Sequence, residues 1–93
     1  MNTTKKLSVV MTDQFMGDIS HIDRNQQGRV LMVIRNIVLN PLEVKGDAIK
    51  PLVGDMKGLW RYRLGDYRLV YLPDKEENKI FLVEFSPRGE VYK

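Results

Sequence analysis

The chain has 93 residues and carries 15 Lys plus Arg against 12 Asp plus Glu, so its formal net charge is +3. A chain of this length buries only about two-thirds of its unfolded surface, and we expect one domain spanning 1–93 around a modest core. Cysteine is absent, which excludes disulfides, thiolate metal sites and cysteine nucleophiles and suits a reducing compartment. No apolar stretch approaches the roughly 20 residues of a membrane helix, and we expect a soluble, cytoplasmic protein.

The first part of the sequence predicts one strand followed by two helices. Residues 5–11 are rich in apolar and β-branched side chains and end at good helix caps. Apolar residues within 13–22 recur at helical spacing, and those within 30–38 form a broad apolar stripe. The polar stretch 23–28 is interpreted as a turn between the helices. The second helix should stop before the Asn-Pro pair at 40–41.

The remainder predicts a loop and then a meander of strands. Residues 40–58 contain several glycines and prolines without periodicity, which indicates a structured loop. The pattern then alternates with period two, and residues 59–64, 67–72 and 80–85 predict three strands. The resulting order, β-α-α-β-β-β, predicts an α+β fold in which two N-terminal helices pack on one face of a mainly antiparallel sheet.

A two-residue turn at Gly65-Asp66 would set the register of the hairpin around it. Side-chain alternation then directs the aromatic and leucine residues toward the helices, and Arg61, Arg63 and Arg68 toward the other face, with no acid among them. Like charges opposed across two strands are destabilising, on the scale of roughly 0.2–1 kcal/mol per pair. The predicted pairs are Leu64–Tyr67, Arg63–Arg68, Tyr62–Leu69, Arg61–Val70 and Trp60–Tyr71.

The three arginines allow two interpretations. They could form a solvated surface cluster, partly paired with Glu84 or Glu90. We favour a phosphate-binding site, because guanidinium groups match phosphate oxygens in a bidentate manner and the cross-strand arginine pair lacks an anion. His21 is the only histidine and is interpreted as a capping or partly exposed residue. Asp13, Asp18 and Asp23 are spaced five residues apart, which would scatter them around a helix, and the glycines match no phosphate-loop spacing. We therefore expect no metal and no cofactor.

Two segments resemble the RelE branch of the RelE/ParE toxin superfamily, namely the run from Lys50 to Tyr71 and the closing Arg88-Gly-Glu-Val-Tyr92. The resemblance implies the toxin of a type II toxin-antitoxin system. It implies a metal-independent endoribonuclease, or mRNA interferase, that cleaves mRNA in the ribosomal A site by 2′-hydroxyl attack and inhibits translation. The implied partners are a cognate antitoxin protein, the ribosome and mRNA, without a membrane.

The resemblance places the family's site positions at Arg61, Arg63, Arg68, Arg88 and Tyr92, and the chemistry of phosphoryl transfer suggests a role for each. Arg68 would stabilise the charge that develops on the phosphorane, Arg88 would lie near the leaving oxygen, and Tyr92 would orient the nucleotide or assist proton transfer. Some family members carry lysines where this chain has arginines, and an arginine does not release its proton, so the sequence names no general base. The catalytic set is Arg68, Arg88, Tyr92 and Arg61, and the substrate-binding set is Arg61, Arg63 and Lys57.

Two other functions stay open at this point. A ParE-like toxin has the same fold but inhibits DNA gyrase without cleaving RNA. A relative that has lost its activity would bind only RNA or its antitoxin. The presence of Arg61, Arg68, Arg88 and Tyr92 in one chain favours cleavage over gyrase inhibition.

Overall fold

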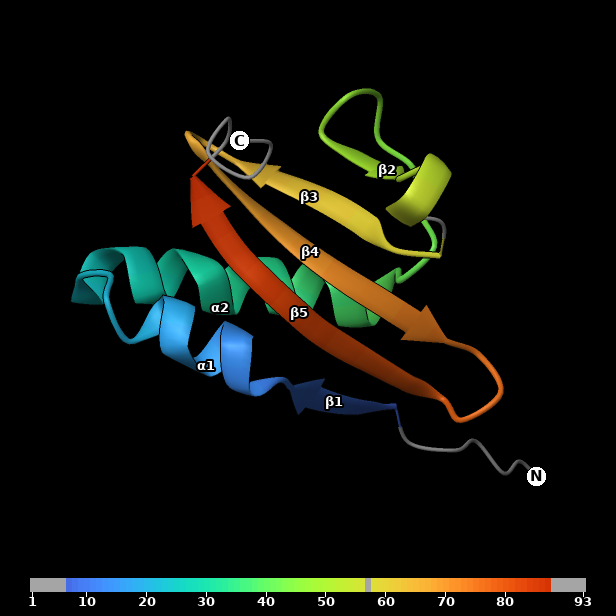
Figure 1. Cartoon of the computed structure of the whole chain (residues 1–93), viewed down its shortest axis with the longest axis horizontal. Helices are drawn as coiled ribbons and strands as arrows, with labels where there is room; N and C mark the ends of the chain where they lie inside the picture. Colours follow the sequence, from blue (N-terminus) through green and yellow to red (C-terminus); the bar gives the residue numbers. More distant parts are fainter. Residues whose placement is uncertain (1–6, 57, 88–93) are drawn as a thin grey trace.

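The computed structural model describes residues 7–56 and 58–87 (Figure 1). Their strands form one sheet in the order β1-β5-β4-β3-β2, in which β1 is parallel to β5 and the other neighbours are antiparallel. The predicted α+β class and mainly antiparallel sheet are therefore confirmed. The elements are β1 (Ser8–Met11), α1 (Asp13–Ile19), α2 (Arg24–Leu39), β2 (Ile49–Pro51), the 3₁₀ turn η1 (Gly54–Met56), β3 (Trp60–Leu64), β4 (Tyr67–Asp74) and β5 (Lys79–Pro87).

Side-chain caps determine where both helices begin. The Thr12 hydroxyl oxygen accepts a hydrogen bond from the Phe15 N–H at 3.1 Å, and the Asp23 carboxylate accepts one from the Gln26 N–H at 2.8 Å. Each cap satisfies an N–H group that the first helical turn leaves without an internal partner. The turn expected over residues 23–28 is wrong, since α2 begins at Arg24. Those residues are polar because the first turn of α2 faces mostly solvent.

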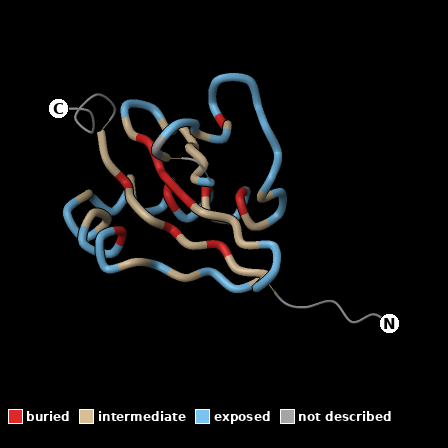
Figure 2. Tube along the Cα trace, turned by 45° about the vertical axis from the view of Figure 1, so that its right-hand side comes forward, coloured by how far each residue is buried: buried red, intermediate tan, exposed pale blue. Residues whose placement is uncertain are grey.

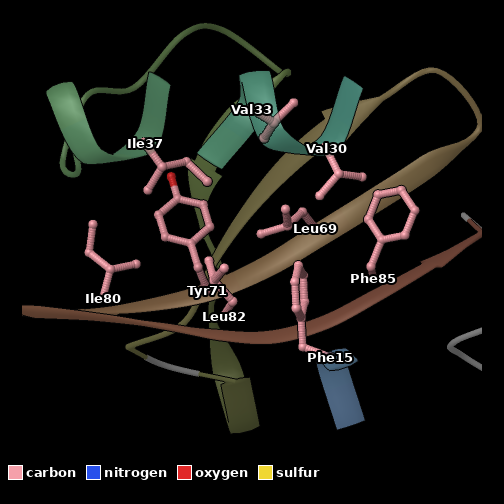
Figure 3. Close-up of a cluster of buried hydrophobic side chains, with 9 residues drawn as sticks. All are labelled: Phe15, Val30, Val33, Ile37, Leu69, Tyr71, Ile80, Leu82 and Phe85. Atoms are coloured by element: carbon pink, nitrogen blue, oxygen red, sulfur yellow. The ribbon is translucent and has the colours of Figure 1, made fainter. Parts of the chain in front are cut away.

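The core lies between the helices and one face of the sheet, with α2 running behind the sheet in the view of Figure 1. Its α2 members recur three and four residues apart, which places them on one side of the helix. The longest buried run of the sheet follows β4 from Arg68 to Tyr71 (Figure 2). The core residues are Phe15, Val30, Val33, Ile37, Leu69, Tyr71, Ile80, Leu82 and Phe85 (Figure 3). In the described part of the chain, neither helix has the length and apolarity that a membrane span requires.

The segment 40–58, expected to be only a loop, also contributes β2 to the sheet. In β2, Ile49 pairs with Tyr62 and Lys50 pairs with Arg61. The Arg63 N–H donates to the Ala48 carbonyl at 2.8 Å, which continues the contact beyond the strand. A strand of three residues is too short to show a period of two in the sequence. Its pairing with β3 therefore decides its conformation.

Helix α1 covers the part of the β5 edge that β1 leaves open. The β1–β5 pairing ends at Met11 and Leu82. Beyond it, the Thr12 hydroxyl donates to the Val83 carbonyl at 3.0 Å, and the Asp18 carboxylate accepts from the Phe85 N–H at 2.9 Å. Side chains of α1 and of its N-cap residue thus take the place of a neighbouring strand and satisfy exposed backbone groups of β5.

Replacing Asp18 with alanine is expected to lower the free energy of unfolding by about 1–2 kcal/mol, because the Phe85 N–H loses a charged acceptor. Urea denaturation measures the change. The matched control is Glu76→Ala, which removes the same charge from an exposed position in the β4–β5 turn and should change stability by less than about 0.5 kcal/mol. Equal decreases in the free energy of unfolding of the two variants would contradict the proposed role of Asp18.

Candidate anion-binding site

The β3–β4 hairpin has the register expected from its turn. Arg63 lies opposite Arg68, Arg61 lies opposite Val70, and the other three predicted pairs are also confirmed. Gly65 adopts a φ of 60°, which suits the first central position of a type II′ turn and which other residues adopt only with strain. A two-residue turn allows only one register between the two strands. In this register Arg63 and Arg68 lie directly opposite each other.

The neighbouring strands extend the same surface on both sides of the hairpin. Lys50 of β2 pairs with Arg61, and Ser86 of β5 pairs with Arg68. Residues paired across strands project to the same face of a sheet. These two residues therefore join Arg61, Arg63 and Arg68 on the side opposite the core, and we call the five residues the arginine face.

Asp47, in the loop between α2 and β2, also reaches the arginine face. One carboxylate oxygen lies 2.9 Å from Lys50 Nζ and 3.6 Å from Arg61 Nη2, and the other lies 3.2 Å from Arg63 Nη2. Arg61 also donates a hydrogen bond to the main-chain carbonyl of Asp47. The hydrogen bond from Lys50, followed by the charges of Lys50 and Arg63, lowers the pKa of Asp47 below its ordinary value. The carboxylate is therefore ionised at neutral pH.

The expectation that no acid lies on this face is thus wrong. The ion pairs of Arg61 and Arg63 are made with Asp47. Glu84 also projects to this side of the sheet, because it pairs with Val70, and it accepts a hydrogen bond from the Ser86 hydroxyl at 2.9 Å. Glu90, the other acid considered as a partner, lies outside the described residues. The sequence pattern did not predict Asp47 on this face because the residue belongs to a loop, and side-chain alternation relates residues to a sheet face only within strands.

The arginines differ in their exposure to solvent. The side chain of Arg63 is 33% exposed and that of Arg61 is 15% exposed, whereas Arg68 is only 2% exposed. Val70, on the same side of β4, is wholly buried. The arginine face is therefore open around Arg63 and covered around Arg68, so a ligand arriving from solvent would first meet Arg63 and Arg61.

The Nε groups of Arg61 and Arg63 are buried and have no acceptor in the described part of the chain. A buried N–H that lacks an acceptor costs about 1–3 kcal/mol, so an anion that reached these donors would be bound favourably. Guanidinium groups would stabilise its charge without taking its proton. The lowered pKa of Asp47 makes it a weak proton acceptor.

The structure brings together only some of the residues assigned to the site from the sequence. Arg61, Arg63 and Arg68 share the arginine face. Sequence reasoning missed Lys50 and Ser86 as members, although alternation would have included both once their strands were paired with the hairpin. Three assigned residues, Lys57, Arg88 and Tyr92, lie outside the described residues.

The histidine lies away from this surface. His21 is exposed, and its Nδ1 lies 2.7 Å from the Gly17 carbonyl oxygen near the end of α1. This contact agrees with the interpretation of His21 as a capping or partly exposed residue.

On the core side of the sheet, a small polar cavity is lined by residues that include Asn36, Tyr62 and Tyr71. Asn36 donates to the Tyr62 hydroxyl at 3.1 Å, and burial raises the pKa of Tyr71. This cavity shares no residue with the arginine face.

The fold and the arginine face together define a small α+β protein that gathers cations on one side of its sheet. The profile of the family described as "ParE toxin of type II toxin-antitoxin system, parDE" matches residues 9–92. The chain belongs to this toxin family, and its resemblance to the RelE/ParE superfamily is confirmed. No curated protein sequence matches the chain significantly.

Solved structures with the same fold come from several organisms. A YoeB/ParE toxin from Agrobacterium tumefaciens is 23% identical with a TM-score of 0.76, over 88% of this chain and 99% of that one. The archaeal RelE-RelB complex from Pyrococcus horikoshii OT3 contains a chain 22% identical with a TM-score of 0.71, over 92% and 99%. The intact E. coli RelBE toxin-antitoxin complex contains one 14% identical with a TM-score of 0.72, over 90% and 99%. At these identities the likeness establishes the fold alone.

Proposed function

We propose that this toxin is a metal-independent endoribonuclease that cleaves mRNA in the ribosomal A site and thereby inhibits translation. The observation that carries the proposal is the convergence of Arg61, Arg63, Arg68 and Lys50 on one face of the sheet. A phosphodiester gains negative charge as it approaches the phosphorane transition state. Cationic donors held in place by strands stabilise that charge more than the ground state, which lowers the barrier.

The proposed reaction is an internal transfer within the RNA. The 2′-hydroxyl oxygen attacks the adjacent phosphorus and loses its proton, while the bond from phosphorus to the 5′-oxygen breaks and that oxygen gains a proton. The products are a 2′,3′-cyclic phosphate and a 5′-hydroxyl. Arg61 and Arg63, with Lys57, would hold the RNA backbone, and Arg68 would stabilise the phosphorane.

The remaining assignments concern proton transfer and alignment. Arg88 would lie near the leaving oxygen, and Tyr92 would orient the nucleotide or assist proton transfer. Because the arginines of this face do not accept a proton, we expect alignment of the 2′-hydroxyl to account for much of the rate enhancement. Holding reacting groups in a productive geometry contributes up to about 7–11 kcal/mol. A ribosome that holds the mRNA would supply this alignment.

The proposed partners follow from the toxin family and the proposed reaction. A cognate antitoxin would bind and neutralise the toxin. The E. coli structure with the same fold is a toxin-antitoxin complex, and the P. horikoshii structure is a RelE-RelB complex. The ribosome and mRNA would be the targets, which places the action in the cytoplasm. A second candidate function, inhibition of DNA gyrase without RNA cleavage, is supported by the ParE description of the matching family.

Mapping of mRNA 5′ ends after a short pulse of expression tests the proposal. The expected result is a set of codon-spaced cuts that carry 5′-hydroxyl ends and occur only in translated regions. A start-codon variant of the same reporter mRNA is the matched control and should stay intact. A supercoiling assay with purified gyrase runs in parallel: altered supercoiling without cuts would establish the second candidate, and no effect in either assay would contradict both.

A further inference from the structure

We propose that Asp47 is an internal competitor for RNA phosphates, whose carboxylate occupies the cations of the arginine face and is displaced when RNA binds. The inference rests on the proposed function, because it assumes that RNA phosphates are the ligands of that face. It adds a residue outside the assigned catalytic and substrate-binding sets and gives it a role opposed to theirs. Asp47 would weaken RNA binding in the free toxin.

The contacts of the carboxylate resemble those that a phosphate group would make. Its two oxygens divide three cations between them: one oxygen contacts Lys50 and Arg61, and the other contacts Arg63. Guanidinium groups recognise carboxylates and phosphates with the same planar set of donors. The carboxylate therefore already uses donors that an incoming phosphate would need.

The carboxylate is also placed where it can move away. The Asp47 side chain is 61% exposed, and exposed ion pairs are individually weak. The loop stays attached to β3 through main-chain atoms, since Arg63 N–H donates to the Ala48 carbonyl and Arg61 donates to the Asp47 carbonyl. Rotation of the side chain would release the three cations without breaking these backbone contacts.

A positioning role is the main alternative for this carboxylate. It would require the carboxylate to stay beside the arginines while RNA is bound, at a distance where two negative charges repel each other. Arg61 already has a main-chain acceptor that keeps it oriented without the carboxylate. The lowered pKa of Asp47 supports competition as well, because the group stays negatively charged under the conditions in which RNA binds.

Fluorescence anisotropy with the full-length protein and a fluorescein-labelled single-stranded RNA of ten nucleotides tests the inference at low salt. Asp47→Asn keeps the shape and removes the charge, and it is expected to lower the dissociation constant about fivefold, as expected for one unit charge near the ligand. Asp47→Glu restores the charge and should bind about as weakly as the wild type. Glu76→Gln removes the same charge from the β4–β5 turn, which lies at the opposite end of β4 from the β3–β4 turn (Figure 1). It should change the dissociation constant less than about twofold.

A parallel arm with Arg61→Gln separates failure of the inference from failure of the proposed function. If Arg61→Gln weakens binding but Asp47→Asn leaves it equal to Glu76→Gln, the inference is overturned and the arginine face still binds RNA. If Asp47→Asn weakens binding while its circular dichroism spectrum is unchanged, Asp47 is a positioning residue and the inference is again overturned. If Arg61→Gln has no effect, the arginine face does not bind RNA, and the proposed function fails together with the inference.

Discussion

Replacing Arg68 with alanine is expected to reduce mRNA cleavage on translating ribosomes by about a hundredfold to a thousandfold, the range seen when one positioned donor to a developing negative charge is removed. Arg68 is central to the arginine face because the hairpin places it opposite Arg63 and the β4–β5 pairing places it opposite Ser86. Alanine retains neither the charge nor the donors. Under the proposed function, expression of this variant no longer arrests growth.

Because Arg68 is buried, its replacement affects stability as well as cleavage, and the two effects have to be measured separately. Only 2% of the residue is exposed, so truncation to alanine also removes packing and lowers the stability of the fold. Cleavage should therefore be measured with purified variants, at a temperature where circular dichroism shows that each is folded. Arg35→Ala removes an exposed arginine from α2 and should cleave like the wild type. A folded Arg68→Ala variant that cleaves at the wild-type rate would remove Arg68 from the mechanism.

Replacing Phe15 with alanine is expected to lower the free energy of unfolding by about 3–5 kcal/mol, the usual cost of truncating a buried phenylalanine. Phe15 is wholly buried and is the member of the core cluster that α1 supplies (Figure 3). Its removal leaves a cavity between α1 and the sheet. Because small domains have total stabilities of only about 5–15 kcal/mol, this one change would remove a large share of the stability.

Thermal and urea denaturation of the Phe15→Ala variant measure this effect. The melting temperature should fall by at least about 12 °C, given a shift of about 4–8 °C per kcal/mol in a domain of this size. Met16→Ala is the matched control, because Met16 follows Phe15 on the same helix and is 47% exposed. The Met16→Ala change should lower the free energy of unfolding by less than about 1 kcal/mol. Similar losses in both variants would mean that α1 does not depend on its buried face.

The hairpin is the part of the structure that sequence patterns predicted most completely. Gly65-Asp66 is a local signal for a two-residue turn, and such a turn allows one register. Alternation along the strands then separates Arg61, Arg63 and Arg68 from the aromatic face, as the pairing confirms. Neither step depends on residues far away in the chain, which explains why both could be made from the sequence.

Features that depend on distant contacts were missed or misjudged. Strand β2 exists because residues 49–51 pair with β3, and its three residues carry no period of their own. The first turn of α2 is polar because it faces mostly solvent, which made it resemble a loop. The burial of Arg68 likewise cannot be derived from alternation, which indicates the face of a strand but not what covers that face.

The sequence by itself determined the class of the fold, the hairpin and the cations that the hairpin places on one face, because turn chemistry and side-chain alternation act over a few residues. The tertiary structure decided which residues surround these cations, which of them form ion pairs and how deeply each is buried. It brought Lys50 beside Arg61, placed Asp47 among three cations and enclosed Arg68. These outcomes depend on where a loop and an edge strand return to the sheet, and packing over the whole chain decides that return.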